Sequence, residues 1–203
     1  MAARISIGFA LVVFALAAAS TASATPTKKS LLGLSPKCGA TSKPFSQFGD
    51  YRNYTFAPDG GLESGGAGWS LSGGAKVVSG NESFFVHSRY DSRSLYMPVG
   101  SSVTSSAMCM GTLSTFIRFF SKSNGAGTLK VQVQFRSLLG TVVGLLNWSS
   151  IGGSSSWQPS PSILNLQSLN AILGANYIQL RLTAVDAPFQ VDDFYVDPWA
   201  SSD

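Results

Sequence analysis

The sequence has one histidine, two cysteines and few charged residues, with 10 Asp and Glu and 14 Lys and Arg among 203 residues. A Ser-His-acid catalytic site would have to use His87, and no Gly-x-Ser-x-Gly turn accompanies it. The histidine and the cysteines match no zinc-binding spacing. No spacing of the ten acids selects the facing carboxylate pair that a glycosidase needs. The sequence therefore predicts a protein that is not an enzyme.

Strong positive charge is also missing. The net charge is +4, and no basic stripe interleaved with aromatic residues occurs. Nucleic-acid-binding proteins carry such stripes because their cations neutralise phosphates. The sequence thus predicts no nucleic-acid partner. A charged fraction of 12% together with 21 glycines is instead typical of an extracellular β-protein with neutral, polar loops.

Only one long apolar run occurs, and it lies near the N-terminus. Arg4 precedes the apolar residues 5–19, and Ala22-Ser23-Ala24 matches the small-x-small rule for cleavage. This pattern predicts a signal peptide over residues 1–24, followed by a flexible, basic lead over residues 25–37. The alternative is an N-terminal membrane anchor, for which a run of about 15 residues is short. We expect a secreted protein with no transmembrane segment in the mature chain.

The two cysteines are Cys38 and Cys109. Export places them in an oxidising environment, where a pair of cysteines is typical of one disulfide. Joining them closes a long loop and lowers the entropy of the unfolded chain, an effect worth roughly 4 kcal/mol. The alternative is a pair of free, buried thiols.

From residue 38 to residue 203 the pattern indicates one domain of short strands. Apolar and polar residues alternate without a break over Leu129–Arg136 and over Tyr177–Thr183, so one face of each strand is expected to be buried and the other wet. Further strands are expected at 68–72, 75–79, 94–97, 103–110, 113–120, 141–146 and 189–196. About nine short strands with Gly-rich turns predict an all-β sandwich or barrel.

One segment departs from this strand pattern. Residues 162–173 carry apolar residues closer to helical spacing, and they follow Pro159 and Pro161 and precede Gly174. Prolines before a segment and a glycine after it are typical of helix boundaries. The sequence therefore predicts one short helix here, with a turn as the alternative.

The last expected strand contains two adjacent carboxylates, Asp192 and Asp193, in an otherwise apolar run. Burying a charge is costly unless it is paired or bound to a metal. Glu63, in the Gly-rich segment 60–66, is the candidate neighbour. Strand alternation puts Asp193 on the same face as Val191, which predicts that Asp193 points inward and Asp192 to the opposite face. The alternatives are a solvent-facing pair or a pair bonded to backbone amides.

Several motifs in this order carry a resemblance to a known group of proteins. They are Cys38, the segment from Pro44-Phe45 to Tyr54, Gly60-Gly61-Leu62-Glu63-Ser64-Gly65 with Gly68-Trp69, Cys109, the strand Thr115–Phe120, Ser156-Trp157-Gln158-Pro159 and the closing run Phe189–Trp199. The chain resembles a group of uncharacterised exported actinobacterial proteins over nearly all of its expected mature length.

More distantly, the acid-Gly-Trp segment and the terminal Asp-Asp strand resemble carbohydrate-binding modules with a galactose-binding-like jelly roll. This resemblance implies a jelly-roll sandwich. It also implies a structural Ca²⁺ that joins Glu63 to Asp193, with Asp192 as the substitute ligand, because Ca²⁺ takes hard oxygen ligands.

Sugar binding in such modules uses aromatic faces and nearby polar groups. Trp148 lies in the polar stretch Asn147–Ser150, and Trp157 is a second candidate, although packing is the alternative for each. The polar loop that begins at His87 offers further binding residues, His87, Arg89 and Tyr90. The alternative is a plain surface loop.

These observations predict a secreted, non-enzymatic binding module with a glycan or cell-envelope component as its partner. A structural or adhesive envelope protein with protein partners is the alternative. A secreted hydrolase that depends on His87 is the third hypothesis.

Overall fold

The computed structural model describes residues 37–111, 114–166 and 174–198. The chain separates into two units, Met1–Ser30 and Leu31–Asp203, and every described residue belongs to the second. The predicted signal peptide at 1–24 and all but the last residue of the predicted lead lie outside the described residues.

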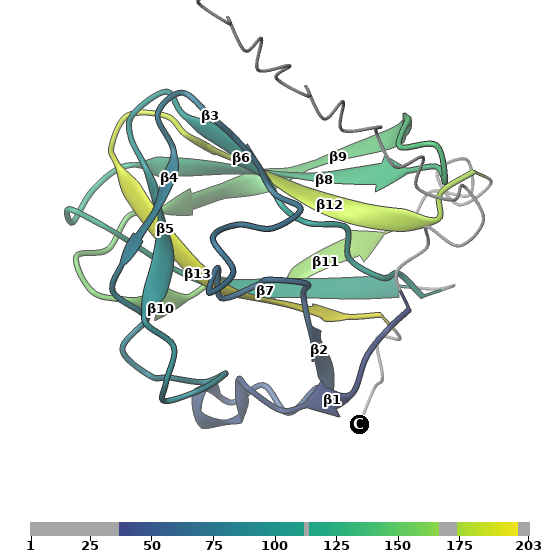
Figure 1. The fold of residues 1–203 in the computed structure, drawn as a ribbon, viewed down its shortest axis with the longest axis horizontal. Coiled ribbons are helices and arrows are strands. Elements are labelled where there is room, and N and C mark those ends of the chain that lie inside the picture. Colours follow the sequence, from purple (N-terminus) through teal and green to yellow (C-terminus); the bar gives the residue numbers. More distant parts are fainter. Residues whose placement is uncertain (1–36, 112–113, 167–173, 199–203) are drawn as a thin grey trace, which may run out of the picture. The chain divides into compact units, whose positions relative to one another are not determined.

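Two antiparallel β-sheets make up this unit, and Figure 1 shows them as two layers. The first, sheet A, has eight strands among the described residues. Its main order is β1 (Thr41–Ser42), β2 (Tyr54–Phe56), β13 (Phe189–Asp197), β5 (Arg93–Met97) and β4 (Lys76–Ser79). Strand β7 (Ser114–Ser123) also pairs with β13, and it carries β10 (Gln158–Pro159) and β11 (Ile163–Leu166) on its other edge.

Sheet B has five strands among the described residues. Their order is β3 (Ser70–Ser72), β6 (Ser102–Thr104), β12 (Tyr177–Ala184), β8 (Thr128–Arg136) and β9 (Val142–Gly152). One short 3₁₀ turn, Ser46–Phe48, accompanies these strands in the described part of the chain. The result is an all-β jelly-roll sandwich, as the sequence predicts.

The core lies between the two sheets because their strands alternate as expected. In sheet B, Val131 and Val133 of β8 and Leu180 of β12 are buried, while their neighbours Lys130 and Arg181 are exposed. From sheet A, the core receives the side chains of Leu95, Met97, Ile117, Phe119, Phe189 and Val191. Removing this apolar surface from water is the main force that holds the layers together.

All nine predicted strands overlap observed strands, but the predicted helix is wrong where the structure describes it. Residues 163–166 form β11, which pairs with β7 from Ile163↔Ile117 to Leu166↔Ser114. The exposed edge of β7 needs partners for its backbone groups, and Pro161 favours an extended residue before it. Tertiary pairing therefore overrides the local helical spacing. Residues 167–173 lie outside the described part.

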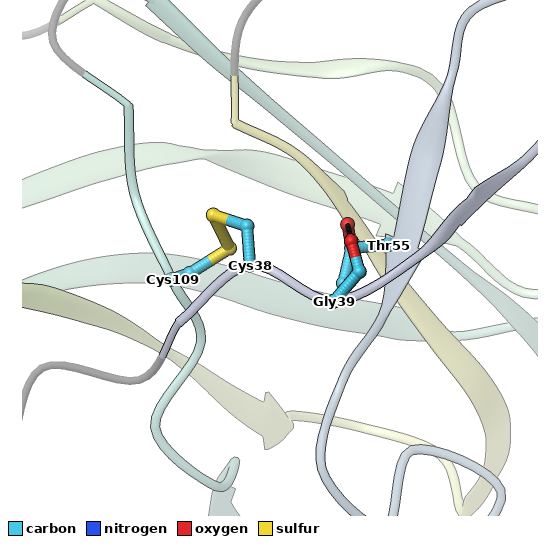
Figure 2. The surroundings of a disulfide bond; sticks show 4 residues. All are labelled: Cys38, Gly39, Thr55 and Cys109. Atoms are coloured by element: carbon cyan, nitrogen blue, oxygen red, sulfur yellow. Dashed lines mark hydrogen bonds between the residues drawn. A yellow bond between two sulfur atoms is a disulfide. The ribbon is translucent and has the colours of Figure 1, made fainter.

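The predicted disulfide is confirmed. Cys38 and Cys109 are bonded, with a Cα–Cα distance of 5.2 Å (Figure 2). Next to it, the Thr55 hydroxyl donates to the Gly39 carbonyl at 3.3 Å. The bridge therefore anchors the start of the domain beside β2. Among the described residues, no helix has the length and apolar character to cross a membrane.

Candidate functional site

Strand β13 contains a β-bulge at the two acids singled out from the sequence. The pairing register with β7 shifts between Asp192 and Tyr195, and Asp193 has a positive φ of 48°. Both aspartates have an exposed fraction of 0%. A bulge re-aims side chains, so the simple alternation that assigned these residues to opposite faces does not apply. Both acids are buried, so the alternative of a solvent-facing pair is wrong.

The two carboxylates differ in their partners. Asp192 accepts the backbone N–H of Glu82 at 2.9 Å and that of Asp193 at 2.9 Å. Neither carboxylate oxygen of Asp193 has a hydrogen-bond partner among the described residues. Backbone amides therefore compensate Asp192, whereas no hydrogen bond from the described residues compensates Asp193.

More acids surround Asp193, and together they form an acidic cluster that consists of Glu63, Glu82, Asp91, Asp192 and Asp193, with His87 beside them. Ligand atoms of His87, Asp91 and Asp193 all lie within 4.8 Å of one another. The Nδ1 atom of His87 lies 2.6 Å from Oδ2 of Asp91, and its ring stacks on Phe56 at 3.7 Å. The cluster joins the loop after β2, the loop between β4 and β5, and β13.

Burial raises the pKa of Asp193 to about 8, and repulsion from Glu82 and Asp91 adds to this effect. The backbone N–H of His87 offsets part of the rise, although its geometry falls short of a hydrogen bond. Burial and then the charge of Asp193 likewise raise the pKa of Asp192 to about 9. A carboxylate with a pKa near 8 binds a proton or a cation readily at neutral pH.

Glu63 lies near Asp193, as the sequence predicts, but its carboxylate is already engaged. It accepts the backbone N–H groups of Ser92 and Arg93, both at 2.8 Å, and the Ser92 hydroxyl at 3.2 Å. The Gly60 carbonyl accepts the N–H of Phe194 at 3.2 Å, which ties this loop to β13. The two ends of the domain therefore do meet.

The donor set fits a hard divalent cation. A Cβ added to Gly61 would lie 3.0 Å from Oδ1 of Asp193 and 3.6 Å from Oδ2 of Asp91, so glycine keeps the space between the acids open. Carboxylate oxygens are the ligands that Ca²⁺ prefers. Because both oxygens of Glu63 already accept hydrogen bonds, Asp91 is the better partner of Asp193, and Glu63 positions the loop that carries Asp91.

A second candidate site is an open groove of about 880 Å³ on sheet B. Strands β8, β9 and β12 form it, and its lining consists of Lys130, Val131, Gln132, Asn147, Ser149, Ser150, Arg181 and Thr183. Across the groove floor, the Gln132 amide donates to the Asn147 amide oxygen at 2.6 Å. The groove therefore offers amides, hydroxyls and cations to a ligand.

Trp148 lies in β9 between two residues of this groove. The register of β8 with β9 passes from Val131↔Ser149 to Gln132↔Asn147, which leaves Trp148 as the extra residue of a β-bulge. Its side chain is outside the described atoms. Its backbone position is beside the groove, as a ligand-stacking role requires.

Trp157, the other predicted aromatic platform, is buried. Its exposed fraction is 6%, and it belongs to an aromatic cluster with Phe120 and Tyr195. The ammonium of Lys122 covers its ring at 4.8 Å from the centroid. Packing, the alternative for this residue, is what the structure shows.

The residues of the loop from His87 to Arg93 lie in two different environments. His87 turns toward the acidic cluster, whereas Tyr90 is 77% exposed. The Arg89 guanidinium donates to the Tyr90 hydroxyl at 2.7 Å and lies over its ring. The lining of the groove on sheet B includes none of these three residues.

The sequence prediction missed the polar residues of the groove, although a signal for them existed. Lys130, Gln132 and Arg181 occupy the wet positions of the two strands with the clearest alternation. Asp91 and Glu82 carry no such signal because loop residues show no periodicity.

No family model matches the sequence, and no curated protein matches it. Several solved structures match the fold. The enzymatically active domain of tailspike protein 4 from bacteriophage CBA120 has a TM-score of 0.50 and 14% identity, over 69% of this chain and 21% of that chain. The CBM22-1 and GH10 modules of a Clostridium thermocellum xylanase, complexed with xylohexaose, have a TM-score of 0.50 and 16% identity, over 70% of this chain and 28% of that chain.

A third structure is the CBM22-1 xylan-binding domain from Paenibacillus barcinonensis, with a TM-score of 0.44 and 16% identity, over 66% of this chain and 88% of that chain. This chain spans less than a third of the tailspike and xylanase chains. At these identities the similarity shows a shared fold, the jelly-roll sandwich, and the function has to be argued from the sites.

Proposed function

We propose that this protein is a secreted, non-enzymatic glycan-binding module whose binding site is the groove on sheet B. The groove itself is the observation that carries this proposal. It is open, it has about 880 Å³, and amides and hydroxyls line it. The Clostridium thermocellum structure with the same fold is a complex with xylohexaose, which supports a saccharide as the ligand class.

The chemistry of the groove suits a sugar. Saccharide hydroxyls both donate and accept hydrogen bonds, and Gln132, Asn147 and Thr183 offer both functions. An indole at position 148 would add an apolar face on which a sugar ring can stack. A ligand held by a few polar groups and one aromatic face matches the general pattern of small-molecule sites.

The arrangement of His87 supports a non-enzymatic role. Among the described residues, its ring forms one hydrogen bond, to Asp91, and stacks on Phe56. In a Ser-His-acid site a serine hydroxyl would bond to the other ring nitrogen, and among the described residues no serine hydroxyl forms that bond. The same histidine fits the cation site better.

The test is retention on immobilised polysaccharides during native gel electrophoresis. Trp148→Ala and Gln132→Ala should each lower retention about tenfold or more, since each removes a contact to the sugar. Tyr90→Ala serves as the matched control because Tyr90 is exposed on a loop and is not part of the groove lining. Unchanged retention in both groove variants, or no retention of the native protein on any polysaccharide, would reject the proposal.

A bound Ca²⁺ is the second part of this proposal. Asp193 and Asp91 would hold it, His87 lies within reach, and Glu63 and Glu82 would keep their backbone partners. When bound, the ion supplies positive charge that neutralises carboxylates buried between three segments. Its role would be structural, because it lies away from the groove lining.

A structural or adhesive role with a protein partner is the second candidate function. Its support is a set of exposed apolar side chains at and near the turn that joins β8 to β9. They are Leu138, Leu139, Val142, Val143 and Leu145. Exposed apolar groups gathered in one place mark interaction surfaces. A protein that co-purifies with the native chain and is lost after Leu139→Ser would favour this role.

A further inference from the structure

The charged residues in the strands of sheet B are all positive. The five strands of sheet B contain Lys130, Arg136 and Arg181 and no Asp or Glu. The acids of the described residues lie in β13 of sheet A or in connecting segments. They are Asp50, Asp59, Glu63, Glu82, Asp91, Asp186, Asp192, Asp193 and Asp197.

Two of the three cations line the groove. The register pairs Lys130 with Thr183 and Arg181 with Gln132, so the two cations are diagonal neighbours across β8 and β12. Diagonal neighbours lie roughly 7–8 Å apart at the backbone. Their flanking residues Leu129, Val131, Leu180 and Leu182 are buried, which directs Lys130 and Arg181 outward.

Neither cation has a carboxylate partner among the described residues. Arg181 donates to the Ser102 hydroxyl at 3.0 Å, a contact that leaves its charge uncompensated. In the same set of residues, the ammonium of Lys130 forms no hydrogen bond or ion pair. The third cation, Arg136, bonds to the Gly140 carbonyl and to the Gln134 amide, so its position is set by neutral groups.

The acid nearest to Arg181 in the sequence does not pair with either cation of the groove. Asp186 follows β12, and its carboxylate accepts the N–H and hydroxyl of Thr128 at the end of the sheet. Asp186 is not among the groove residues. The groove therefore presents uncompensated positive charge to whatever enters it.

We propose that the ligand of this groove is an acidic polysaccharide, one whose sugar units carry carboxylates. The proposal rests on the proposed glycan-binding function and specifies its substrate class. The guanidinium of Arg181 can bind a carboxylate through two parallel hydrogen bonds, and Lys130 contributes a point charge beside it. Gln132, Asn147 and Thr183 then contact the sugar hydroxyls.

The arrangement distinguishes an acidic chain from a neutral one. A neutral chain covers the two cations without compensating them and removes part of their hydration, which opposes binding. A carboxylated chain replaces that hydration with charge-assisted hydrogen bonds. Its binding should weaken as salt is added, because the groove is open and the charges are screened.

The test compares two forms of one polymer, polygalacturonate and its fully methyl-esterified form, in which the carboxylates are neutral. The native protein should bind polygalacturonate about tenfold or more tightly than the ester, and salt should reduce this difference. Arg181→Gln and Lys130→Gln should each weaken binding to polygalacturonate about tenfold, and neither change should weaken binding to the ester. Lys76→Gln is the matched control, since Lys76 is an exposed cation of β4 in sheet A.

Other outcomes overturn the proposal. Equal binding of the two polymer forms would reject the acidic ligand and leave the glycan-binding function standing. Equal binding of poly-glutamate would mean that charge alone is recognised and not a saccharide. Polygalacturonate binding that both groove variants retain would place the site elsewhere. Binding to no polysaccharide at all would reject the proposed function as well. Thermal melting of each variant checks its folding, and Lys130→Gln stands in if Arg181→Gln is unstable.

Discussion

At the scale of single residues, the buried ion pair of Asp50 and Arg118 is a main polar feature of sheet A. Nη1 of Arg118 donates to Oδ2 of Asp50 at 2.9 Å, and the Tyr54 hydroxyl donates to the same oxygen at 2.8 Å. The Nε and Nη2 groups of Arg118 donate to the Ser160 carbonyl. Burial alone would raise the pKa of Asp50, but the hydrogen bonds from Tyr54, the Arg52 N–H and Arg118 lower it overall.

This geometry predicts a large effect of Arg118→Met. The change leaves a buried carboxylate without its main cation, and losing one partner of a buried pair costs about 3–5 kcal/mol. Chemical denaturation measures the loss. Arg52→Ala is the matched control because Arg52 bonds to the same Asp50 from a more exposed position, at 3.1 Å. An exposed pair contributes about 0–1 kcal/mol. Similar losses in both variants would contradict the prediction.

At the scale of elements, the turn between β7 and β8 depends on close packing as well as on backbone conformation. Gly127 has a φ of +109°, and a Cβ added there would lie 2.3 Å from the Cβ of Ala187. Gly80 has nearly the same φ, +111°, with nothing within 4 Å of an added Cβ. A residue with a Cβ would therefore strain the backbone at both positions, but only at Gly127 would the added Cβ meet a neighbouring atom.

Gly127→Ala should for this reason cost more stability than Gly80→Ala. The difference should be about 1–3 kcal/mol, the usual cost of forcing extra atoms into a packed site. Denaturant unfolding of the two variants measures it. Equal losses would show that backbone conformation alone sets the requirement for glycine at position 127.

For the long strands, the local sequence pattern is sufficient to predict which side chains face the core. The alternation of β8 and β12 is a local property of each strand, and it places their core residues correctly, although Gln134 at a predicted wet position is buried. β1, β2 and β10 were missed because they have two or three residues each and no alternating pattern marks them. β11 was missed because its segment has helical spacing. Their pairing partners, and not their own sequences, make them strands.

At the scale of the whole molecule, the acidic cluster links segments that are far apart in the chain. The backbone N–H of Glu82 donates to the carboxylate of Asp192, and the two residues are 110 positions apart in the sequence. A cation bound there would stabilise the folded state by mass action, by about 2.7 kcal/mol when its concentration is 100 times the dissociation constant.

The pH dependence of stability should reveal this site. Asp193 has a folded pKa raised from 3.8 to about 8, so the folded state holds its proton more tightly than the unfolded state. The stabilisation is complete below pH 4 and is lost as the pH rises through about 8. In the presence of a chelator, the melting temperature should therefore decrease as the pH rises over this range. Added Ca²⁺ should remove this decrease.

Asp193→Asn should abolish the response to Ca²⁺ and reduce the decrease with pH to the part that Asp192 contributes, because an amide neither titrates nor supplies a charged ligand. Asp186→Asn is the control, since Asp186 bonds to Thr128 at the start of β8 and is not one of the cluster residues. A melting temperature that does not respond to Ca²⁺ at pH 8 would show that the cluster holds no cation.

The amino-acid sequence by itself determined the class of fold, the faces of the long strands and the Cys38–Cys109 pair, because these follow from a local period of two and from residue chemistry. Only the tertiary structure decided that a bulge buries both Asp192 and Asp193, that Asp91 joins them, and that Trp157 packs inside. It also decided that Lys130 and Arg181 share one groove. These features depend on which distant segments become neighbours in the fold. The local sequence of a strand or loop does not specify which segment it will pack against.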